Sequence, residues 1–255
     1  MQAAHFLNGV RSLRRGWSLV WTKGIRRYAF VPLLINILVF ATVGWRLFES
    51  YEGWLESLSW LDRFGDWALV AFISTVLKLI GGIILAVVMG LLLTVLASFL
   101  ASPFNGLLAE RVEAHLDDSK TPASFQLAQF LATIPKALFS ELRKLLYLVL
   151  WMIPIVLLHF IPGINIIAPF ILFGFMAWMY AIEYLDYPLG NQGAGFSEVR
   201  KTLGAHRSKA LGFGTPLSIL VAIPVVNLIV IPIAVAGATA LYVEQIKHDN
   251  ADFAR

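Results

Sequence analysis

The 255-residue chain contains no cysteine, which excludes disulfide bonds and thiolate metal sites. Charged residues make up only 14% of it, against about 25% in ordinary soluble domains. The five histidines are scattered, and none has metal-ligand spacing to another on one helix face. H-E-x-x-H, a Walker-type phosphate loop, G-x-S-x-G and dinucleotide-binding glycines are all missing. We therefore expect no enzyme activity, no metal or other cofactor, and no nucleic-acid partner.

The chain is rich in apolar residues and contains long uncharged stretches. It is 58% hydrophobic, with a mean hydropathy of +0.75. Four stretches lack Asp, Glu, Lys and Arg: residues 28–45, 79–109, 145–182 and 211–243. A helix needs about 20 apolar residues to cross a bilayer core of about 30 Å. The sequence therefore predicts an all-α integral membrane protein, with 1–255 as a single membrane domain and lipid around it.

The distribution of charge predicts the orientation of the chain in the membrane. Residues 1–27 hold six Lys or Arg and no acid, whereas residues 46–66 hold two arginines and five acids. Short basic segments stay on the cytoplasmic side. We expect a multi-pass protein with a cytoplasmic N-terminus. Nothing in the first 27 residues has the apolar core of a cleaved signal.

Residues 1–27 predict an amphipathic helix at the membrane interface. Phe6, Val10, Leu13 and Trp17 recur at spacings of three and four, and Val20 or Trp21 continues the row. Such an apolar stripe, flanked by arginines, is typical of a helix that lies on anionic lipid.

Residues 28–100 predict two long membrane helices, the first at 28–45 and the second at about 67–100. The sequence A-S-P-F-N-G at 101–106 is expected to break the second helix, because proline lacks an N–H and clashes with the preceding turn. Residues 101–144 then form a charged, cytoplasmic helical segment, whose apolar stripe is expected to be interrupted at Pro135.

The last two uncharged runs repeat one pattern, I-P-x-x-N-x-I closed by a second proline, at 161–169 and 223–232. Glycine follows the closing proline at +5 and alanine at +8 in both. Each run, 145–182 and 211–243, should fold as two helices around a Pro-Asn apex, and Asn165 and Asn227 are expected to cap helix N-termini. The 13 residues 211–223 make only about 20 Å of helix, so half-penetrating hairpins are predicted. Broken helices in matching positions point to a solute path.

Gly24, Ile25, Arg26 and Arg27, at the start of the first span, form the sharpest candidate binding site. A helix N-terminus attracts anions, glycine permits close approach of the backbone, and guanidinium groups match tetrahedral oxyanions. Anchoring of the span to lipid headgroups is the alternative, and composition alone favours it.

Charged residues at two other places are weaker candidates. Glu110, Arg111 and Glu113 follow the expected break and could line a vestibule, with a solvated helix start as the alternative. Glu183 and Asp186, where the first repeat leaves the membrane, are expected to act as caps or interface residues.

Several motifs together resemble the CysZ family of bacterial sulfate permeases. The matching segments, in family order, are 24–27 (GIRR), 31–36 (VPLLIN), 102–110 (SPFNGLLAE), 160–163 (FIPG), 186–188 (DYP) and 237–240 (GATA). The likeness runs over nearly the whole chain, from about residue 6 to residue 244.

The resemblance implies sulfate uptake across the bacterial inner membrane, feeding cysteine synthesis, by a helical protein of full spans and half-penetrating hairpins that assembles as homo-oligomers. The family's sulfate site, Gly-hydrophobic-Arg, falls on Gly24, Ile25 and Arg26, with Arg27 adjoining. For the translocation path the resemblance suggests Ser102, Asn105 and Glu110, and Arg111 lies just past the matched residues.

Sulfate entry opposes the membrane potential, at a cost of about 4.6 kcal/mol per 100 mV for two charges. Either the cytosol keeps free sulfate very low and a passive pore suffices, or protons accompany the anion. Glu110, Glu183, Asp186 and His159 are then candidate carriers. A channel or carrier for another oxyanion, such as sulfite or thiosulfate, and a non-transporting membrane scaffold are the alternative functions.

Overall fold

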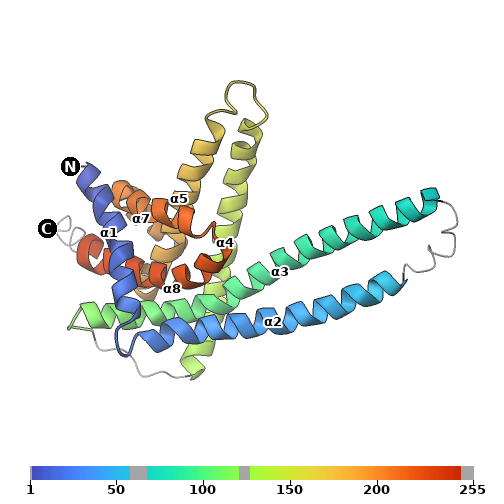
Figure 1. Ribbon diagram of the computed structural model, residues 1–255. Helices are drawn as coiled ribbons and strands as arrows, with labels where there is room; N and C mark the ends of the chain where they lie inside the picture. The colour runs from blue at the N-terminus through green and yellow to red at the C-terminus, as the bar shows by residue number, and fades with distance from the viewer. Residues whose placement is uncertain (1, 58–67, 121–126, 248–255) are drawn as a thin grey trace. The chain divides into compact units, whose positions relative to one another are not determined.

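The computed structural model describes residues 2–57, 68–120 and 127–247, and all regular secondary structure in this part of the chain is helical (Figure 1). The helices are α1 (Gln2–Val20), α2 (Arg26–Ser57), α3 (Ala68–Leu116), α4 (Leu127–Leu158), α5 (Ala168–Asn191), α6 (Phe196–Ala205), α7 (Arg207–Leu220) and α8 (Pro224–Leu241), followed by a π-helical turn, η2 (Tyr242–Ile246). Three helical segments among these residues are long and apolar enough to cross a membrane: Arg26–Gly53, Ala168–Asn191 and Ile229–Ile246. The predicted all-α membrane protein is confirmed.

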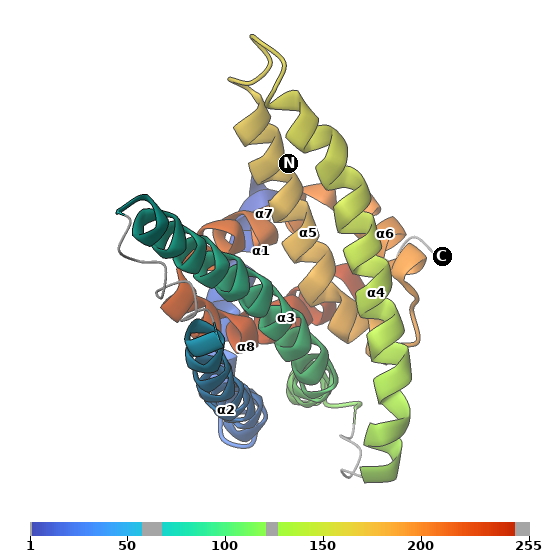
Figure 2. The same cartoon turned by 90° about the vertical axis from the view of Figure 1, so that its right-hand side faces the viewer.

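The chain divides into two compact units. Residues 34–101 form the smaller unit, which contains most of α2 and α3. These two helices lie side by side within it (Figures 1 and 2), and Gly82 of α3 faces the ring of Tyr51 on α2. Large apolar side chains such as Phe48 and Phe72 are exposed on them. Such all-round hydrophobicity is typical of helices surrounded by lipid.

The larger unit, residues 1–33 and 102–255, is organised by close contacts between small residues. Helix α1 packs against both α7 and α8 (Figure 1). Gly9 of α1 touches the backbone of Lys209, and Gly16 touches the backbone of Ile233. In return, Gly212 of α7 lies against the carbonyl of Phe6. Each of these positions has no room for a Cβ, so glycine is what allows the helix backbones to meet.

The small residues shared by the two repeats lie mostly at such contacts. Ala177 of α5 is buried, and its carbonyl faces Gly214 of α7. Gly237 of α8 meets the carbonyl of Ser12 on α1, and Ala240, also on α8, is fully buried. Gly174 is the exception, because a Cβ there would enter open space. The repeat therefore encodes helix packing at three of the four small positions.

The buried face of α1 matches the predicted apolar stripe only at Leu13 and Val20. Its buried residues are Gly9, Ser12, Leu13, Gly16, Leu19 and Val20. Trp17 and Trp21 are each about half exposed. The prediction placed the helix by its large apolar residues, whereas its packing is decided by small ones that permit backbone contact.

Both breaks that were predicted from proline outside the repeats are wrong. Helix α3 continues without interruption through residues 101–106 to Leu116, and α4 continues through Pro135 and Pro154. A proline removes one hydrogen bond, and tertiary contacts can hold the remaining turns in place. In α3, Asn105 donates a hydrogen bond to Tyr187, and the carbonyl of Gly106 accepts one from Asn191.

Both repeats fold as two helices joined by a turn, as predicted. Pro162 and Gly163, which has φ +85°, lie in the turn between α4 and α5, and Pro224 begins α8. The predicted asparagine caps are wrong. The N-cap residues of α5 and α8 are Ile167 and Ile223, neither with a side-chain cap. Proline near the first helical position already fixes the backbone there, so a polar cap is dispensable.

The lengths of the helices indicate whether each hairpin can cross the membrane. Helix α7 has 14 residues, and about 21 Å of helix is too short for a hydrocarbon core of about 30 Å. Helix α5 has 24 residues and is long enough to cross. A half-penetrating second hairpin stays our prediction, and the first hairpin could take either form.

The contact between α5 and α7 generates the first prediction. The Cβ of Gly214→Ala would overlap the carbonyl oxygen of Ala177, so either the backbones separate or the helix shifts. We expect a loss of about 1–3 kcal/mol in the free energy of unfolding, measured by thermal or denaturant unfolding in detergent. The control is Gly174→Ala in α5, where space is open and alanine should be neutral or slightly stabilising. Equal stability of the two variants would contradict close packing.

Candidate functional site

A short turn connects α1 to α2 and carries the predicted anion-binding residues. Gly24 has φ +93°, a left-handed conformation that favours glycine. The carbonyl of Thr22 accepts hydrogen bonds from the amides of Ile25 (3.1 Å) and Arg26 (3.2 Å). The side chain of Ile25 is 3% exposed and anchors the turn in the core. Arg26 and Arg27 are both exposed at the start of α2.

The ring of Tyr28 brings two arginines together from distant parts of the sequence. The guanidinium carbon of Arg27 lies 5.1 Å from the ring centroid, and that of Arg111, on α3, lies 5.0 Å from it. Both distances are within the range of cation–π attraction. A predicted binding residue and a predicted path residue therefore meet at one aromatic side chain, which the sequence analysis did not single out.

The other predicted path residues lie elsewhere. Glu110 is partly buried next to Arg111 on α3. Asn105 is buried and donates its Nδ2 hydrogen bond to the Tyr187 hydroxyl over 3.2 Å, so it faces α5 rather than Tyr28. Ser102 is within α3, but its side chain lies outside the described part of the structure.

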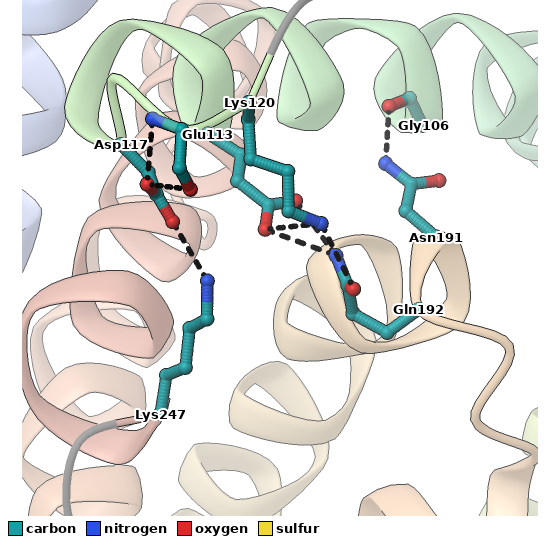
Figure 3. A network of polar contacts seen from close by, with 8 residues as sticks. Gly106, Glu113, Asp117, Lys120, Asn191, Gln192 and Lys247 are labelled. Carbon is teal, nitrogen blue, oxygen red and sulfur yellow. Dashed lines mark hydrogen bonds and ion pairs between the residues drawn. The ribbon is translucent and has the colours of Figure 1, made fainter.

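The end of α3 is fixed by a polar network, shown in Figure 3, that we call the α3 terminal network: Glu113, Asp117, Lys120, Gln192 and Lys247. The Gln192 amide donates to both carboxylate oxygens of Glu113, at 3.0 and 2.8 Å, and Lys120 Nζ lies 3.5 Å from Glu113 Oε1. Lys247 Nζ lies 2.7 Å from Asp117 Oδ2. These contacts hold the helix that carries Arg111 against the ends of α5 and η2.

The pKa values of the Asp117–Lys247 pair move apart. Hydrogen bonds from Lys247, then from Ser119, hold the pKa of the Asp117 carboxyl well below its ordinary value. The hydrogen bond to Asp117 raises the pKa of Lys247. Both shifts favour the charged forms and so stabilise the fold.

A buried ammonium group is surrounded by acids between α4 and α5, and we call it the Lys144 cluster: Lys144, Glu141, Glu183, Asp186 and Tyr187. Lys144 is 2% exposed, and its Nζ lies 2.9 Å from Glu141, 2.8 Å from Glu183 and 3.4 Å from Asp186. The Tyr187 hydroxyl donates to Glu183 over 3.1 Å while accepting from Asn105 of α3. The cluster therefore ties α4 to α5 through charge, and the neutral hydrogen bond from Asn105 to Tyr187 adds α3.

The Lys144 cluster corrects the predicted role of Glu183 and Asp186. They sit inside α5, which ends at Asn191, and bind Lys144 instead of capping a helix. The sequence held a usable signal. Lys144 and Glu183 flank the uncharged run 145–182, so folding that run into a hairpin brings the opposite charges together.

The remaining candidates lie outside both networks. The Nδ1 atom of His159 lies 3.0 Å from the carbonyl of Ile155, one turn earlier. Within the described residues, no group of three or more His, Asp or Glu side chains has an arrangement that could hold a metal ion.

Comparison with known proteins identifies relatives over nearly the full chain. A family described as sulfate transporter CysZ/etoposide-induced protein 2.4 matches residues 12–232. A relative named sulfate transporter CysZ, from Pectobacterium atrosepticum, is 36% identical over 250 residues. The matched region covers 98% of this chain and 89% of the relative's length. Another protein of that name, from Salmonella typhimurium, is 38% identical over 238 residues. This match covers 93% of this chain and 92% of the relative's length. Both are named as transporters, which supports the expectation that this chain is not an enzyme.

The Lys144 cluster generates the second prediction. Lys144→Met should lower the free energy of unfolding by about 3 kcal/mol or more, because three carboxylates would be left together without their cation. Thermal unfolding in detergent measures the loss. Lys201→Met is the matched control, since Lys201 is exposed on α6. If both variants unfold at the wild-type temperature, the cluster does not hold α4 to α5.

The third prediction concerns pH. Because the pKa of Asp117 is lower in the folded protein, its charge stabilises the fold fully at pH values above its pKa in the unfolded chain, about 3.9. This stabilisation is lost progressively as the pH falls below that value. Because the pKa of Lys247 is higher in the folded protein, its charge stabilises the fold fully below its pKa in the unfolded chain, about 10.4. This stabilisation is lost as the pH rises further. The difference in melting temperature between wild type and Asp117→Asn should thus be largest between about pH 4 and pH 10. A difference that persists unchanged at pH 3 would argue against the ion pair.

Proposed function

Because this chain belongs to the sulfate transporter CysZ/etoposide-induced protein 2.4 family, we propose that it carries sulfate into the bacterial cell across the inner membrane. The sulfate would supply assimilation into cysteine. The observation that carries the proposal at the level of residues is the meeting of Arg27 and Arg111 at Tyr28.

The turn at residues 24–27 suits a tetrahedral dianion. The guanidinium groups of Arg27 and Arg111 would act on one bound sulfate ion and supply the two positive charges that it needs, each with a planar fork of donors. The amides of Ile25, Arg26 and Tyr28 already donate within the turn. The anion would therefore be bound chiefly by the arginine side chains, with the positive end of the α2 dipole adding to the attraction.

The path we propose leads from Arg26 and Arg27 to Arg111. The Tyr28 ring attracts both guanidinium groups, which lie 5.1 and 5.0 Å from its centroid, and so favours the presence of both cations beside it before the anion arrives. Glu110 would set the charge balance beside Arg111. Ser102 and Asn105, earlier on the same helix, stay predicted path residues, with Asn105 bonded to Tyr187 on α5.

The membrane topology is part of the proposal. The base-rich N-terminal segment favours a cytoplasmic N-terminus, and assembly as a homo-oligomer stays a prediction. The chain has no cysteine of its own, so single cysteines can be introduced at the apices, at Gly163 and at Val225. A cysteine at Val225 should be shielded from an impermeant reagent added outside, because α7 is too short to cross the bilayer. A cysteine at Gly163 tells which of the two forms the first hairpin takes. Ready external labelling that sulfate does not block would show an ordinary spanning hairpin.

Two driving mechanisms are open to this architecture. A passive pore fits the absence of any ATP-binding motif in the sequence, provided that metabolism keeps cytosolic sulfate low. Coupling to protons would need a titratable group on the path, and Glu110 lies next to Arg111. Labelled sulfate uptake into proteoliposomes, with the potential and the pH gradient set independently, separates the two.

The fourth prediction tests the site. Arg26→Ala and Arg27→Ala should each weaken sulfate binding about tenfold to a hundredfold, because a charge-assisted hydrogen bond contributes about 1.5–3 kcal/mol. Calorimetry on purified protein measures the affinity, and labelled sulfate flux in proteoliposomes measures transport. Lys23→Ala is the control, as it removes one charge beside the motif.

Unchanged sulfate affinity in both arginine variants would contradict the site and favour the alternative, in which Arg26 and Arg27 anchor the first span to lipid headgroups. Absence of sulfate flux through the wild-type protein would favour the scaffold. Competition by sulfite or thiosulfate stronger than by unlabelled sulfate would instead favour another oxyanion as the substrate.

A further inference from the structure

An apolar groove of about 470 Å³ lies between α1 and the start of α8. This volume is within the range of roughly 300–1,000 Å³ that ligand sites span. Val10, Leu13 and Trp17 line it from α1, and Ile229 and Ile233 from α8. Ile229 and Trp17 are 44% and 52% exposed, so the groove presents apolar surface that neither helix covers.

One charged residue, Arg14, lines this groove, and every other lining residue is apolar. Its side chain is exposed, and it makes no ion pair with any of the residues that the structure describes. The neighbouring Arg15 differs, because its Nε lies 3.3 Å from Glu244 Oε1. An apolar groove whose one lining cation has no ion-pair partner among the described residues is complementary to an amphiphile with an apolar tail and an anionic head.

Trp17 indicates the depth at which this groove meets the membrane. It follows Arg14 by three residues, so the two side chains lie on neighbouring parts of one helix face. Its ring contacts that of Trp21 at a centroid distance of 6.0 Å, and both are about half exposed. Exposed tryptophans concentrate at the headgroup level of membrane proteins. Arg14 would therefore lie near lipid phosphates, with the groove facing acyl chains.

We propose that this groove is a binding site for an anionic phospholipid, with an acyl chain along Val10, Trp17 and Ile229 and the headgroup phosphate on Arg14. The lipid would cover the seam between α1 and α8 and support the helix that leads into the turn at residues 21–25. The inference does not rest on the proposed function, since it needs only a membrane around the protein.

Native mass spectrometry of the purified full-length chain tests the site, with phosphatidylglycerol and phosphatidylcholine of identical acyl chains added in detergent. Wild type should retain phosphatidylglycerol in preference to phosphatidylcholine. Arg14→Gln should bind phosphatidylglycerol about fivefold more weakly, since one cation near the headgroups contributes about 1 kcal/mol. Arg14→Lys should keep the preference, because it keeps the charge.

Arg11→Gln is the matched control. It removes the same charge from the same helix at a position that does not line the groove, and it should change retention by no more than about twofold. Ile229→Trp should reduce retention of both lipids by filling the groove.

Three results would overturn the proposal. One is equal loss of phosphatidylglycerol in Arg11→Gln and Arg14→Gln, which would show a diffuse charge effect. Another is equal retention of the two lipids by wild type. The third is loss of an oligomer in Ile229→Trp with lipid retention unchanged, which would assign the groove to a second copy of the chain.

Discussion

The larger unit depends on backbone contact between helices at glycine. Gly9 and Gly16 allow α1 to pack directly against the backbones of α7 and α8, and Gly214 allows α7 to pack against α5. In a bilayer the lipid tails are as apolar as leucine, so close packing of small residues takes over much of the role that hydrophobic burial has in water. The turn at Gly24 is the direct continuation of α1, and its position follows from these contacts.

Charge supplies the second set of constraints, away from the glycine contacts. The Lys144 cluster fixes α4 to α5 through an ammonium group that is almost fully buried. The α3 terminal network fixes the end of α3 to Gln192 and Lys247. Between them α3 is held along one side, and Arg111 is kept beside Tyr28. Both arginines thus lie within about 5 Å of the centre of one ring, that of Tyr28.

The fold class and the helix pairs of the two repeats could be predicted from the sequence, because long uncharged runs and paired prolines are local signals. The continuity of α3 through residues 101–106 could not, since it depends on tertiary partners such as Tyr187 and Asn191. Only Leu13 and Val20 of the buried face of α1 belonged to the predicted stripe, because the small residues of that face carry little hydrophobic signal. For the site, Gly24–Arg27 stood out by motif and resemblance, whereas Tyr28 gained importance only once α3 was placed beside it.

The central proposal is that Arg27 and Arg111 act on one sulfate ion, and a double-mutant cycle tests it most directly. Sulfate affinity would be measured by calorimetry for wild type, Arg27→Gln, Arg111→Gln and the double variant. Both single variants should lose affinity, and the losses should be non-additive by about 0.5–3 kcal/mol, as expected for residues that share a ligand. Losses that add within about 0.5 kcal/mol, or no loss in Arg111→Gln, would contradict the account.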